Sequence, residues 1–238
     1  MKTAVMQPYI FPYIGYYQLM NAVDTFVILD DVNFITRGWI NRNNILLEGK
    51  AHLFSLPLES ASQNKLICET KMKFGEKERQ KFLKTIQMSY KKAPYFDDFY
   101  PILESIILRA EDDLTGFIHN SFLDTFNYLG IEKNILRSSQ LDKDNSLVAQ
   151  ERIIEICKCV NTNLYINPSG GKSLYHKAMF SKDGIELRFI NTLFERIKYK
   201  QYDVEFIVGL SFIDVLMFNS VDKIRQMLEA YTLVEGEV

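Results

Sequence analysis

Apolar and polar positions along the first thirty residues predict a strand, a loop, a helix and a second strand. A short apolar run, Thr3 to Met6, is followed by a stretch rich in proline and aromatic side chains. Apolar residues then recur at helical spacing from Ile14, and a second apolar strand, Thr25 to Leu29, ends at Asp30-Asp31. This order forms a βαβ unit, whose loop lies at the carboxyl end of the first strand, where open α/β sheets bind ligands.

The middle of the chain changes to a hairpin and then to helices. Asn44 to Leu58, with a turn at 48–50, alternates as a β-hairpin, and Leu66 to Met72 is a further predicted strand. The apolar spacing then predicts helices over residues 76–90, about 95–108 and 112–128. We therefore expect a helical section over about residues 75–130, inserted between two α/β parts.

Strands and helices alternate again after residue 130. The predicted strands are 134–137, 163–166 and 185–190. The predicted helices are 145–160, a helix that opens within 167–175 and runs to about 180, and 222–231, after which we expect a polar, frayed tail. The pattern predicts a single α/β domain over residues 1–238 with a mostly parallel, Rossmann-like sheet.

Composition and charge exclude several classes of partner. The 238 residues are 47% hydrophobic, which supports a sizeable core. The net charge of -2 argues against a basic surface for nucleic acid. The three cysteines have no disulfide-framework spacing, which favours a reducing compartment. No apolar run approaches the ~20 residues that span a bilayer, and the first residues lack signal-peptide features. We expect a cytoplasmic protein with no nucleic-acid partner and no membrane span.

The loop after the first strand is the first candidate for ligand chemistry. Pro8 and Pro12 fix their φ angles and lack backbone donors, so this stretch is neither a ladder strand nor a helix interior. We expect a rigid, aromatic-walled loop in which Tyr9 and Tyr13 stack on a sugar or a base.

Hydrogen-bond donors concentrate in residues 32–44, which have no clear period. Arginine can clamp a carboxylate or a phosphate with two parallel hydrogen bonds. The alternative is a surface loop whose tryptophan covers the core. The candidate ligand-binding residues of this segment are Arg37, Trp39, Asn41, Arg42 and Asn43.

Acidic residues and glycines at strand ends supply further candidates. Asp30 and Asp31 end a strand, where carboxylates hold a metal or orient a ligand hydroxyl. The segment Pro168-Ser-Gly-Gly-Lys-Ser173 lies between a strand and a predicted helix, so its backbone and Lys172 are placed for an anion. A plain glycine turn is an equal alternative there, because the Walker A spacing is absent.

Ser211 and Asp214 lie in an otherwise apolar, helix-like run. A buried aspartate needs a partner, so Asp214 is either functional or paired with an arginine. The three histidines are scattered without ligand spacing, and no nucleophile elbow is present. We therefore predict no metal site built on histidine and no triad hydrolysis.

Several of these motifs together resemble a known family. They are Gln7-Pro8-Tyr9-x-x-Pro12-Tyr13-x-Gly15-Tyr16, Asp24-x-Phe26-Val27 with Asp30-Asp31-Val32, Arg37-Gly38-Trp39-x-Asn41-Arg42, Asn167-Pro-Ser-Gly-Gly-Lys172 with Tyr175, and Leu210-Ser-x-x-Asp214 with Phe218-Asn219. Over nearly its whole length the chain resembles the WbqC-like protein family. It departs from that family at Met6, where a histidine is frequent, and at Tyr13, where tryptophan is usual, so a mechanism that needs that histidine does not carry over.

The resemblance implies a bacterial cytoplasmic protein of O-antigen, lipopolysaccharide or capsule biosynthesis that acts on sugar nucleotides. The strand, loop, helix and strand at the N-terminus are also similar in layout to nucleotidyltransferases with the HIGH signature, although the signature histidines are missing. The resemblance implies a transferase that attaches a small acyl or aminoacyl group to the amine of a nucleotide-linked sugar. ATP and magnesium would activate the carboxylate donor.

The residues carry the following expected roles. Asp30, Asp31 and Arg42 are the expected catalytic residues. The expected substrate-binding residues are Gln7, Tyr9, Tyr13, Gly15, Arg37, Trp39, Asn41, Asn43, Ser169, Gly170, Gly171, Lys172, Tyr175, Ser211 and Asp214. Two alternatives stay open: a metal-dependent glycosyl- or nucleotidyltransferase, and a non-catalytic sugar-nucleotide-binding partner protein. Either form is compatible with a homodimer.

Overall fold

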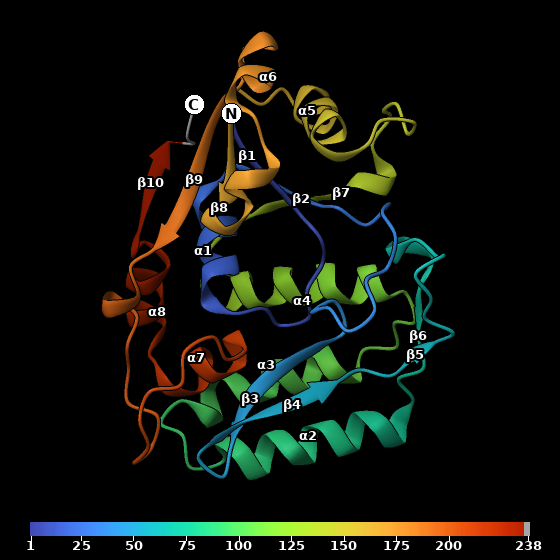
Figure 1. Cartoon of the computed structure of the whole chain (residues 1–238). Coiled ribbons are helices and arrows are strands. Elements are labelled where there is room, and N and C mark those ends of the chain that lie inside the picture. The colour runs from blue at the N-terminus through green and yellow to red at the C-terminus, as the bar shows by residue number, and fades with distance from the viewer. Residues whose placement is uncertain (236–238) are drawn as a thin grey trace.

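The main sheet has six strands in the order β10-β9-β8-β1-β2-β7 in the computed structural model, which describes residues 1–235 (Figure 1). The strands are β1 (Lys2–Met6), β2 (Thr25–Ile28), β7 (Asn134–Arg137), β8 (Leu164–Pro168), β9 (Glu186–Thr192) and β10 (Tyr231–Glu235). The first five run parallel, and β10 pairs with β9 in the antiparallel sense. The predicted α/β fold with a mostly parallel, Rossmann-like sheet is confirmed.

Apolar residues on both faces explain why β1 and β2 are interior strands of the sheet. Ala4 and Val5 are neighbours in sequence, yet they belong to different buried clusters, because successive side chains of a strand point to opposite faces. Phe26 joins the cluster of Ala4, and Val27 joins the cluster of Val5. A parallel sheet buried in this way needs a layer of helices on each face.

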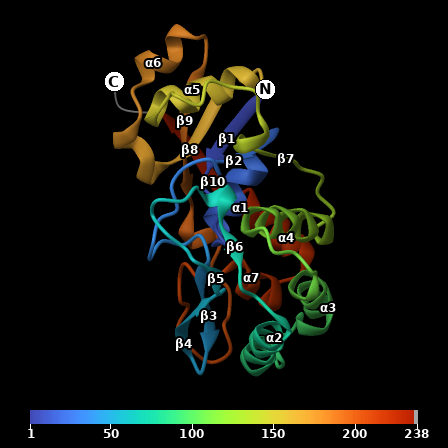
Figure 2. The ribbon, with the colours of Figure 1, turned by 90° about the vertical axis from the view of Figure 1, so that its right-hand side faces the viewer.

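Helices supply both layers (Figure 2). The cluster that contains Ala4 also contains apolar residues of α1 (Ile14–Ala22), α4 (Leu114–Tyr128) and α8 (Val221–Leu228). The cluster that contains Val5 includes residues of α5 (Ala149–Cys159) and α6 (Lys177–Lys182). Within residues 1–235, no helix combines the length and apolarity needed to cross a bilayer.

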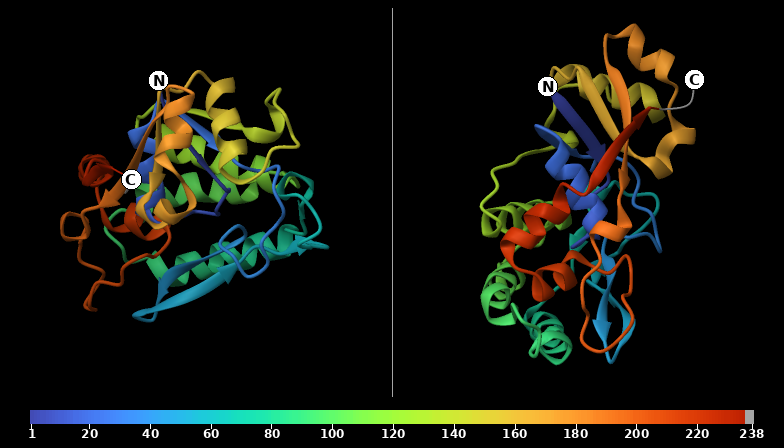
Figure 3. Two further views of the ribbon diagram at one scale, coloured as in Figure 1. Left: turned by 45° about the horizontal axis from the view of Figure 1, so that its top comes forward. Right: turned by 90° about the vertical axis from the view of Figure 1, so that its left-hand side faces the viewer.

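The predicted helical section is present between β2 and β7. It consists of α2 (Glu76–Tyr90), α3 (Phe96–Leu108) and α4; α4 lies nearest the sheet, followed by α3 and then α2 (Figures 1 and 2). The predicted hairpin is also present as β3 (Arg42–Leu47) and β4 (Lys50–Ser55). Its turn residues Glu48 and Gly49 have φ angles of 50° and 74°, as a tight hairpin turn requires. Figure 3 shows the hairpin and the helices beyond the carboxyl edge of the sheet.

The segment Leu66–Met72 is not the single strand that its alternation predicts. It forms a 3-10 helix, Ile67–Glu69, followed by the short strand β6 (Lys71–Met72), which pairs with β5 (Leu58–Glu59). The amides of Ile67 and Cys68 donate to carbonyls of the loop after β2, at Val32 and Asp30. These local bonds replace the ladder that a longer strand would need.

Two predicted helices differ from the structure at their starts. The helix expected from residue 145 begins at Ala149, because Asp144 accepts hydrogen bonds from both the amide and the hydroxyl of Ser146 in a polar turn. The helix expected to open within 167–175 is instead a 3-10 helix, Ser169–Leu174, followed by the six-residue α6.

The end of the chain also differs from the expectation. The last helix stops at Leu228, and β10 contains Tyr231, the expected end of that helix, together with residues 232–235 of the expected frayed tail. Leu233 of β10 pairs with Ile190 of β9. The strand conformation of this segment therefore depends on its pairing with β9. The remainder of the predicted tail, residues 236–238, lies outside the described residues.

The fully buried helix α7 (Phe212–Phe218) joins the C-terminal part of the chain to α1. The ring of Phe212 stacks on Tyr17 at a centroid distance of 3.9 Å. We predict that Phe212→Ala lowers the free energy of unfolding by about 3–5 kcal/mol, because it removes a buried aromatic ring. Phe194→Ala, at a side chain that is 48% exposed, is the control and should cost about 0.5 kcal/mol or less. Urea denaturation measures both, and equal losses would contradict this packing role.

Candidate functional site

The carboxyl ends of five parallel strands form one edge of the sheet. The order in which the chain adds strands to the sheet reverses at β1. From β1 the order continues through β2 to β7 on one side, whereas β8 and β9 lie on the other side of β1. The boundary between β1 and β8 is therefore a topological switch point, where open α/β sheets bind their ligands. The proline-rich loop follows β1 at this boundary, and residues 169–172 follow β8.

The loop Gln7–Tyr13 is held in place through its carbonyl groups. Asn43 Nδ2 donates to the carbonyls of Ile10, at 3.1 Å, and Phe11, at 2.8 Å. Ser211 Oγ also donates to the Phe11 carbonyl, and the amide of Phe212 donates to Pro12. These bonds hold Phe11 at a φ of 40°, which is costly for a bulky residue. The predicted rigid loop is thus built by β3 and the start of α7.

Four of the predicted binding residues line one hollow of about 320 Å³, here called the aromatic pocket. It is lined by Tyr9, Pro12, Tyr13, Trp39, Asn43, Phe194, Val208 and Gly209. Tyr13, Trp39 and Phe194 are each more than a third exposed, so their faces are accessible to a ligand. Burial raises the pKa of Tyr9 and of Tyr13, so both phenols are neutral donors at pH 7.

Glycine 15 allows Tyr13 to lie where it does. A Cβ atom added at Gly15 would stand 2.4 Å from a ring carbon of Tyr13, closer than any side chain permits. Gln7 is half-buried at the start of the loop, and its backbone carbonyl accepts a hydrogen bond of 2.7 Å from the Tyr16 hydroxyl. Gly15 therefore acts on the pocket by positioning an aromatic wall.

Arg42 supports the aromatic pocket and does not extend freely into solvent. Its Nε donates to the Gly38 carbonyl at 2.7 Å, and an Nη atom donates to the carbonyl of Arg37. The guanidinium lies over the Trp39 ring, 5.8 Å from the centroid. Arg37 itself is exposed, in the left-handed region at a φ of 62°. Asn41 Nδ2, in contrast, donates a hydrogen bond to the Leu56 carbonyl.

The two aspartates at the end of β2 have different environments. Asp30 is fully buried, and one carboxylate oxygen accepts from Arg137 Nε at 2.9 Å and Ser139 Oγ at 2.8 Å. Its other oxygen meets Ser138 Oγ at 3.1 Å and the Ser139 amide at 2.9 Å. Ser138 has one hydroxyl proton and donates it at the shorter distance to Asp31, so three donors remain on Asp30. Because the Asp30 side chain is fully buried, it is not accessible to a magnesium ion or a substrate amine.

Asp31 retains acceptor capacity. Lys143 Nζ and Ser138 Oγ each contact one of its carboxylate oxygens at 2.5 Å. Burial would raise the pKa of Asp31, but the hydrogen bonds from Lys143 and Ser138 outweigh it, and the pKa is lowered. Asp31 is therefore ionised at neutral pH and is a weak base that can still accept one hydrogen bond on each oxygen.

Asp31 and Tyr175 line a second hollow, of about 440 Å³, here called the aliphatic pocket. Its lining residues are Leu29, Asp31, Val32, Asn33, Leu66, Val148, Ala149, Gln150, Arg152, Ile153, Leu174 and Tyr175. Within residues 1–235, no group of three or more His, Cys, Asp or Glu residues is arranged to hold a metal ion. Since Asp30 is fully buried and paired with Arg137, and Asp31 pairs with Lys143, the acids at this edge do not fit the expected magnesium site.

The glycine segment after β8 does not precede a long helix, so the expected row of helix amides is absent from it. Ser169 Oγ donates to the Ile190 carbonyl at 2.8 Å, which fixes the segment to β9. Gly171 is required because a Cβ there would lie 2.3 Å from Asn167 Oδ1, whereas Gly170 faces open space. The half-buried Lys172 is left as the positive group of this segment.

Asp214 is paired with neutral groups, so of its two predicted alternatives the arginine partner is wrong. Tyr90 and Tyr199 donate to its two oxygens at 3.0 and 2.5 Å, and Gln201 Nε2 donates at 2.6 Å. Ser211 caps α7 by accepting from the Ile213 amide. Neither residue lines the aromatic or the aliphatic pocket. Both therefore stabilise the segments that pack around the proline-rich loop.

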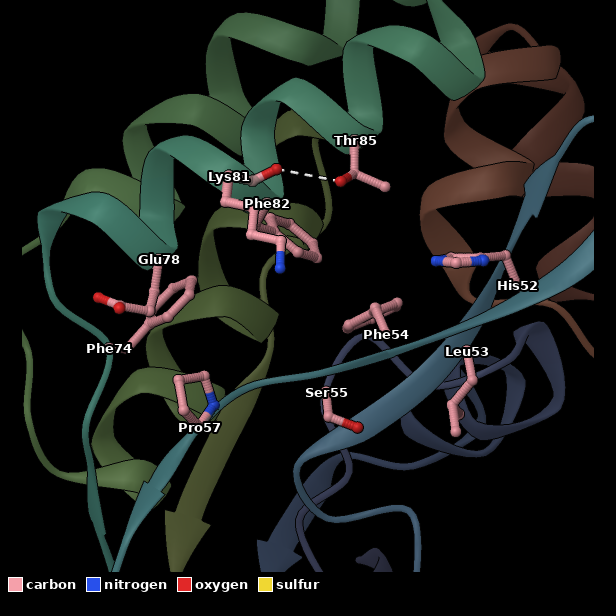
Figure 4. A pocket seen from close by; sticks show the side chains of 10 residues that line it. All are labelled: His52, Leu53, Phe54, Ser55, Pro57, Phe74, Glu78, Lys81, Phe82 and Thr85. Atoms are coloured by element: carbon pink, nitrogen blue, oxygen red, sulfur yellow. Dashed lines mark hydrogen bonds between the residues drawn. The ribbon is translucent and has the colours of Figure 1, made fainter.

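A third hollow, about 330 Å³, lies between β4 and α2, away from the carboxyl edge (Figure 4). Phe54, Phe74 and Phe82 form its apolar side, and Glu78 and Lys81 lie along α2. None of the residues expected from the sequence to bind substrate lines it. Of the residues predicted for the site, Tyr9, Tyr13, Trp39 and Asn43 line the aromatic pocket, and Asp31 and Tyr175 line the aliphatic pocket.

Sequence reasoning missed the cations and hydroxyls that hold the two aspartates. These are Arg137, Ser138, Ser139, Lys143 and Arg152. One signal was available, since β7 ends in Arg137 and two serines, and parallel strands bring their carboxyl ends to the same edge. Lys143 and Arg152 lie in a loop and a helix whose approach no local pattern reveals.

Comparison with known proteins agrees with the resemblance in the motifs. The model of the WbqC-like protein family matches residues 7–226, beginning at the first residue of the proline-rich loop. "Uncharacterized protein Rv1507c" of Mycobacterium tuberculosis (strain ATCC 25618 / H37Rv) is 24% identical over 220 residues, which cover 92% of this chain and 93% of that protein. No solved structure matches the chain.

The buried Asp214 makes stability depend on pH in a testable direction. Burial raises its pKa more than the hydrogen bonds from Tyr199, Gln201 and Tyr90 lower it. A group with a raised folded-state pKa stabilises below its unfolded value of about 3.9, and this contribution is lost as pH rises through the folded pKa. We predict that unfolding free energy falls more steeply above pH 4 in the native chain than in Asp214→Asn.

Urea denaturation between pH 4 and pH 8 measures these slopes. Asp203→Asn is the matched control, because the Asp203 side chain is 98% exposed. It should retain the native slope, whereas Asp214→Asn should flatten it by up to about 1.4 kcal/mol per pH unit. Identical slopes in all three proteins would contradict the assignment.

Proposed function

Because the chain belongs to the WbqC-like protein family, we propose that it modifies a nucleotide-linked sugar in bacterial surface-polysaccharide biosynthesis, by acyl or aminoacyl transfer to an amino sugar. The observation that carries this proposal is the aromatic pocket at the carboxyl edge of the sheet. Within residues 1–235, the Tyr9 and Tyr13 hydroxyls and the Trp39 indole N–H donate no hydrogen bond to the protein. Flat apolar faces with unused donors at their edges suit a sugar or a nucleobase.

The charged residues divide between binding and support. Arg37 is exposed, and Lys172 is half-buried after β8, so these two are assigned to the phosphates of the sugar nucleotide. Arg42 is assigned to hold Trp39, because its donors bind the carbonyls of residues 37 and 38. Gln7, at the start of the loop, is assigned to a polar group of the sugar or base.

The chemical step needs an amine, an activated acyl donor and an acceptor for hydrogen bonds. The amine nitrogen attacks the acyl carbon, a C–N bond forms, the bond to the leaving group breaks, and the amine gives its proton to water. Asp31 orients the amine by accepting a hydrogen bond, since its lowered pKa makes it a weak base. ATP would supply the activation of a carboxylate donor when it is bound.

Two alternatives remain distinguishable from this proposal. A metal-dependent glycosyl- or nucleotidyltransferase would need Asp30 and Asp31 as ligands, and the burial of Asp30 against Arg137 disfavours it. A non-catalytic sugar-nucleotide-binding partner protein would use the same aromatic pocket but form no product. Mass spectrometry of a reaction with an amino sugar nucleotide and an acyl donor separates catalysis from binding.

The first test is a thermal-shift panel of UDP, dTDP, GDP, their amino sugars and ATP, with and without magnesium. A ligand at about 100 times its dissociation constant stabilises the fold by about 2.7 kcal/mol. Trp39→Ala and Tyr13→Ala should each weaken sugar-nucleotide binding by about 5- to 150-fold, because stacking on one ring contributes about 1–3 kcal/mol. Met88→Ala, at a 69% exposed residue outside the pocket, is the matched control.

The outcomes of the thermal-shift panel distinguish the proposed function from its alternatives. Stabilisation by sugar nucleotides that is lost in Trp39→Ala supports the proposal, whereas ATP as the sole ligand would shift it to carboxylate activation. A panel without any shift would overturn sugar-nucleotide binding and favour an interaction protein.

A further inference from the structure

The aliphatic pocket differs in chemistry from the aromatic pocket at the same edge. Its walls are mainly aliphatic side chains of the β2 end, the start of α5 and the segment after β8, with Tyr175 as the sole aromatic residue among them. At about 440 Å³ it falls within the range of small-molecule sites. Aliphatic walls select against flat polar rings and favour a flexible apolar chain.

Two exposed side chains border this pocket. Val148 is 65% exposed and Leu174 is 67% exposed, although both are aliphatic and line the same concave surface. Between Val148 and the rest of α5, Ala149 has a φ of 48°, in the left-handed region that L-residues avoid. Strained backbone of this kind concentrates at ligand sites. Apolar rims, a concave volume and local strain therefore coincide at one place.

The cation that lines the pocket, Arg152, is already paired within the protein. Arg152 donates to the carbonyls of Leu147, Asn145 and Asp31, at 2.8 to 2.9 Å. Asp31 pairs with Lys143, whose side chain is only 1% exposed. A ligand that enters the pocket finds no unpaired cation, and a second carboxylate would meet the ionised Asp31. The aliphatic group that enters therefore carries no negative charge.

The strands whose carboxyl ends lead to the residues of the two pockets alternate along the sheet. The aromatic pocket takes Tyr9 from the end of β1 and Phe194 from the end of β9, whereas the aliphatic pocket takes residues that follow β2 and β8. Both pockets therefore take their walls from the carboxyl edge of the same sheet. Two pockets of different chemistry at one edge match a reaction with two substrates.

We propose that the aliphatic pocket binds a short, uncharged aliphatic chain. Its further identification as the acyl chain of the group that is transferred rests on the proposed function, whereas the binding of an aliphatic chain does not. The Asp31 carboxylate then lies beside the acyl end, where the acceptor amine must approach.

The test uses neutral amides as probes, from propanamide to hexanamide, with hexanoate as the charged partner of hexanamide. Two-dimensional ¹H–¹⁵N NMR titration of the full chain gives the affinity and the site. We expect shifts at Val148, Gln150 and Leu174, affinity that rises about fourfold per methylene until the pocket is filled, and weaker binding of hexanoate. Val148→Asp and Leu174→Asp should weaken hexanamide binding at least tenfold.

These variants should fold, because both residues are exposed and aspartate is a favourable residue at the Val148 helix cap. Met88→Asp, at an equally exposed apolar residue elsewhere, should bind hexanamide as the native chain does. Amide binding that ignores chain length, shifts that map elsewhere, or displacement of hexanamide by adenosine would each overturn the proposal. Thermal stabilisation of the same variants by sugar nucleotides reports on the aromatic pocket separately. The proposed function and the binding of an aliphatic chain can therefore each fail independently of the other.

Discussion

The structure depends on a shortage of backbone donors in the loop after β1. Two prolines remove N–H groups there, while the carbonyls of the loop still need partners because unpaired buried carbonyls are costly. Asn43 from β3, Ser211 and the amide of Phe212 at the start of α7 supply those partners. Elements far apart in sequence thus meet at the carboxyl edge. The aromatic pocket is a product of the same requirement, since its walls belong to the segments that meet there.

A second constraint is the burial of charge at the ends of β2 and β7. Asp30 is neutralised by Arg137, which also binds Asp113 at the start of α4, so the sheet and the helical section share one ion-pair cluster. Removing one member would leave an uncompensated buried charge, which is far more costly than an exposed one. Asp31 belongs to the same cluster but lines a pocket, and the two adjacent aspartates therefore have different roles.

Sequence patterns predicted the elements that local periodicity specifies. The β1-α1-β2 unit, the hairpin turn at Glu48-Gly49 and the three helices after Gly75 all carry their own apolar spacing or turn residues. The segment Leu66–Met72 and strand β10 were missed because their backbone partners, in the loop after β2 and in β9, are distant in sequence. In the site, Tyr9, Tyr13 and Trp39 were recognisable from composition. The burial of Lys143 was not, since an isolated lysine gives no local sign of a partner.

The bond between Ser211 and the Phe11 carbonyl spans 200 positions of the chain. Contacts of such separation form late during folding, because the entropy of closing the intervening chain is lost before they stabilise anything. The helices of residues 76–128 can gain structure locally, whereas the loop after β1 stays unsupported until the C-terminal part of the chain arrives. A nascent chain on the ribosome therefore cannot assemble the aromatic pocket until α7 has emerged.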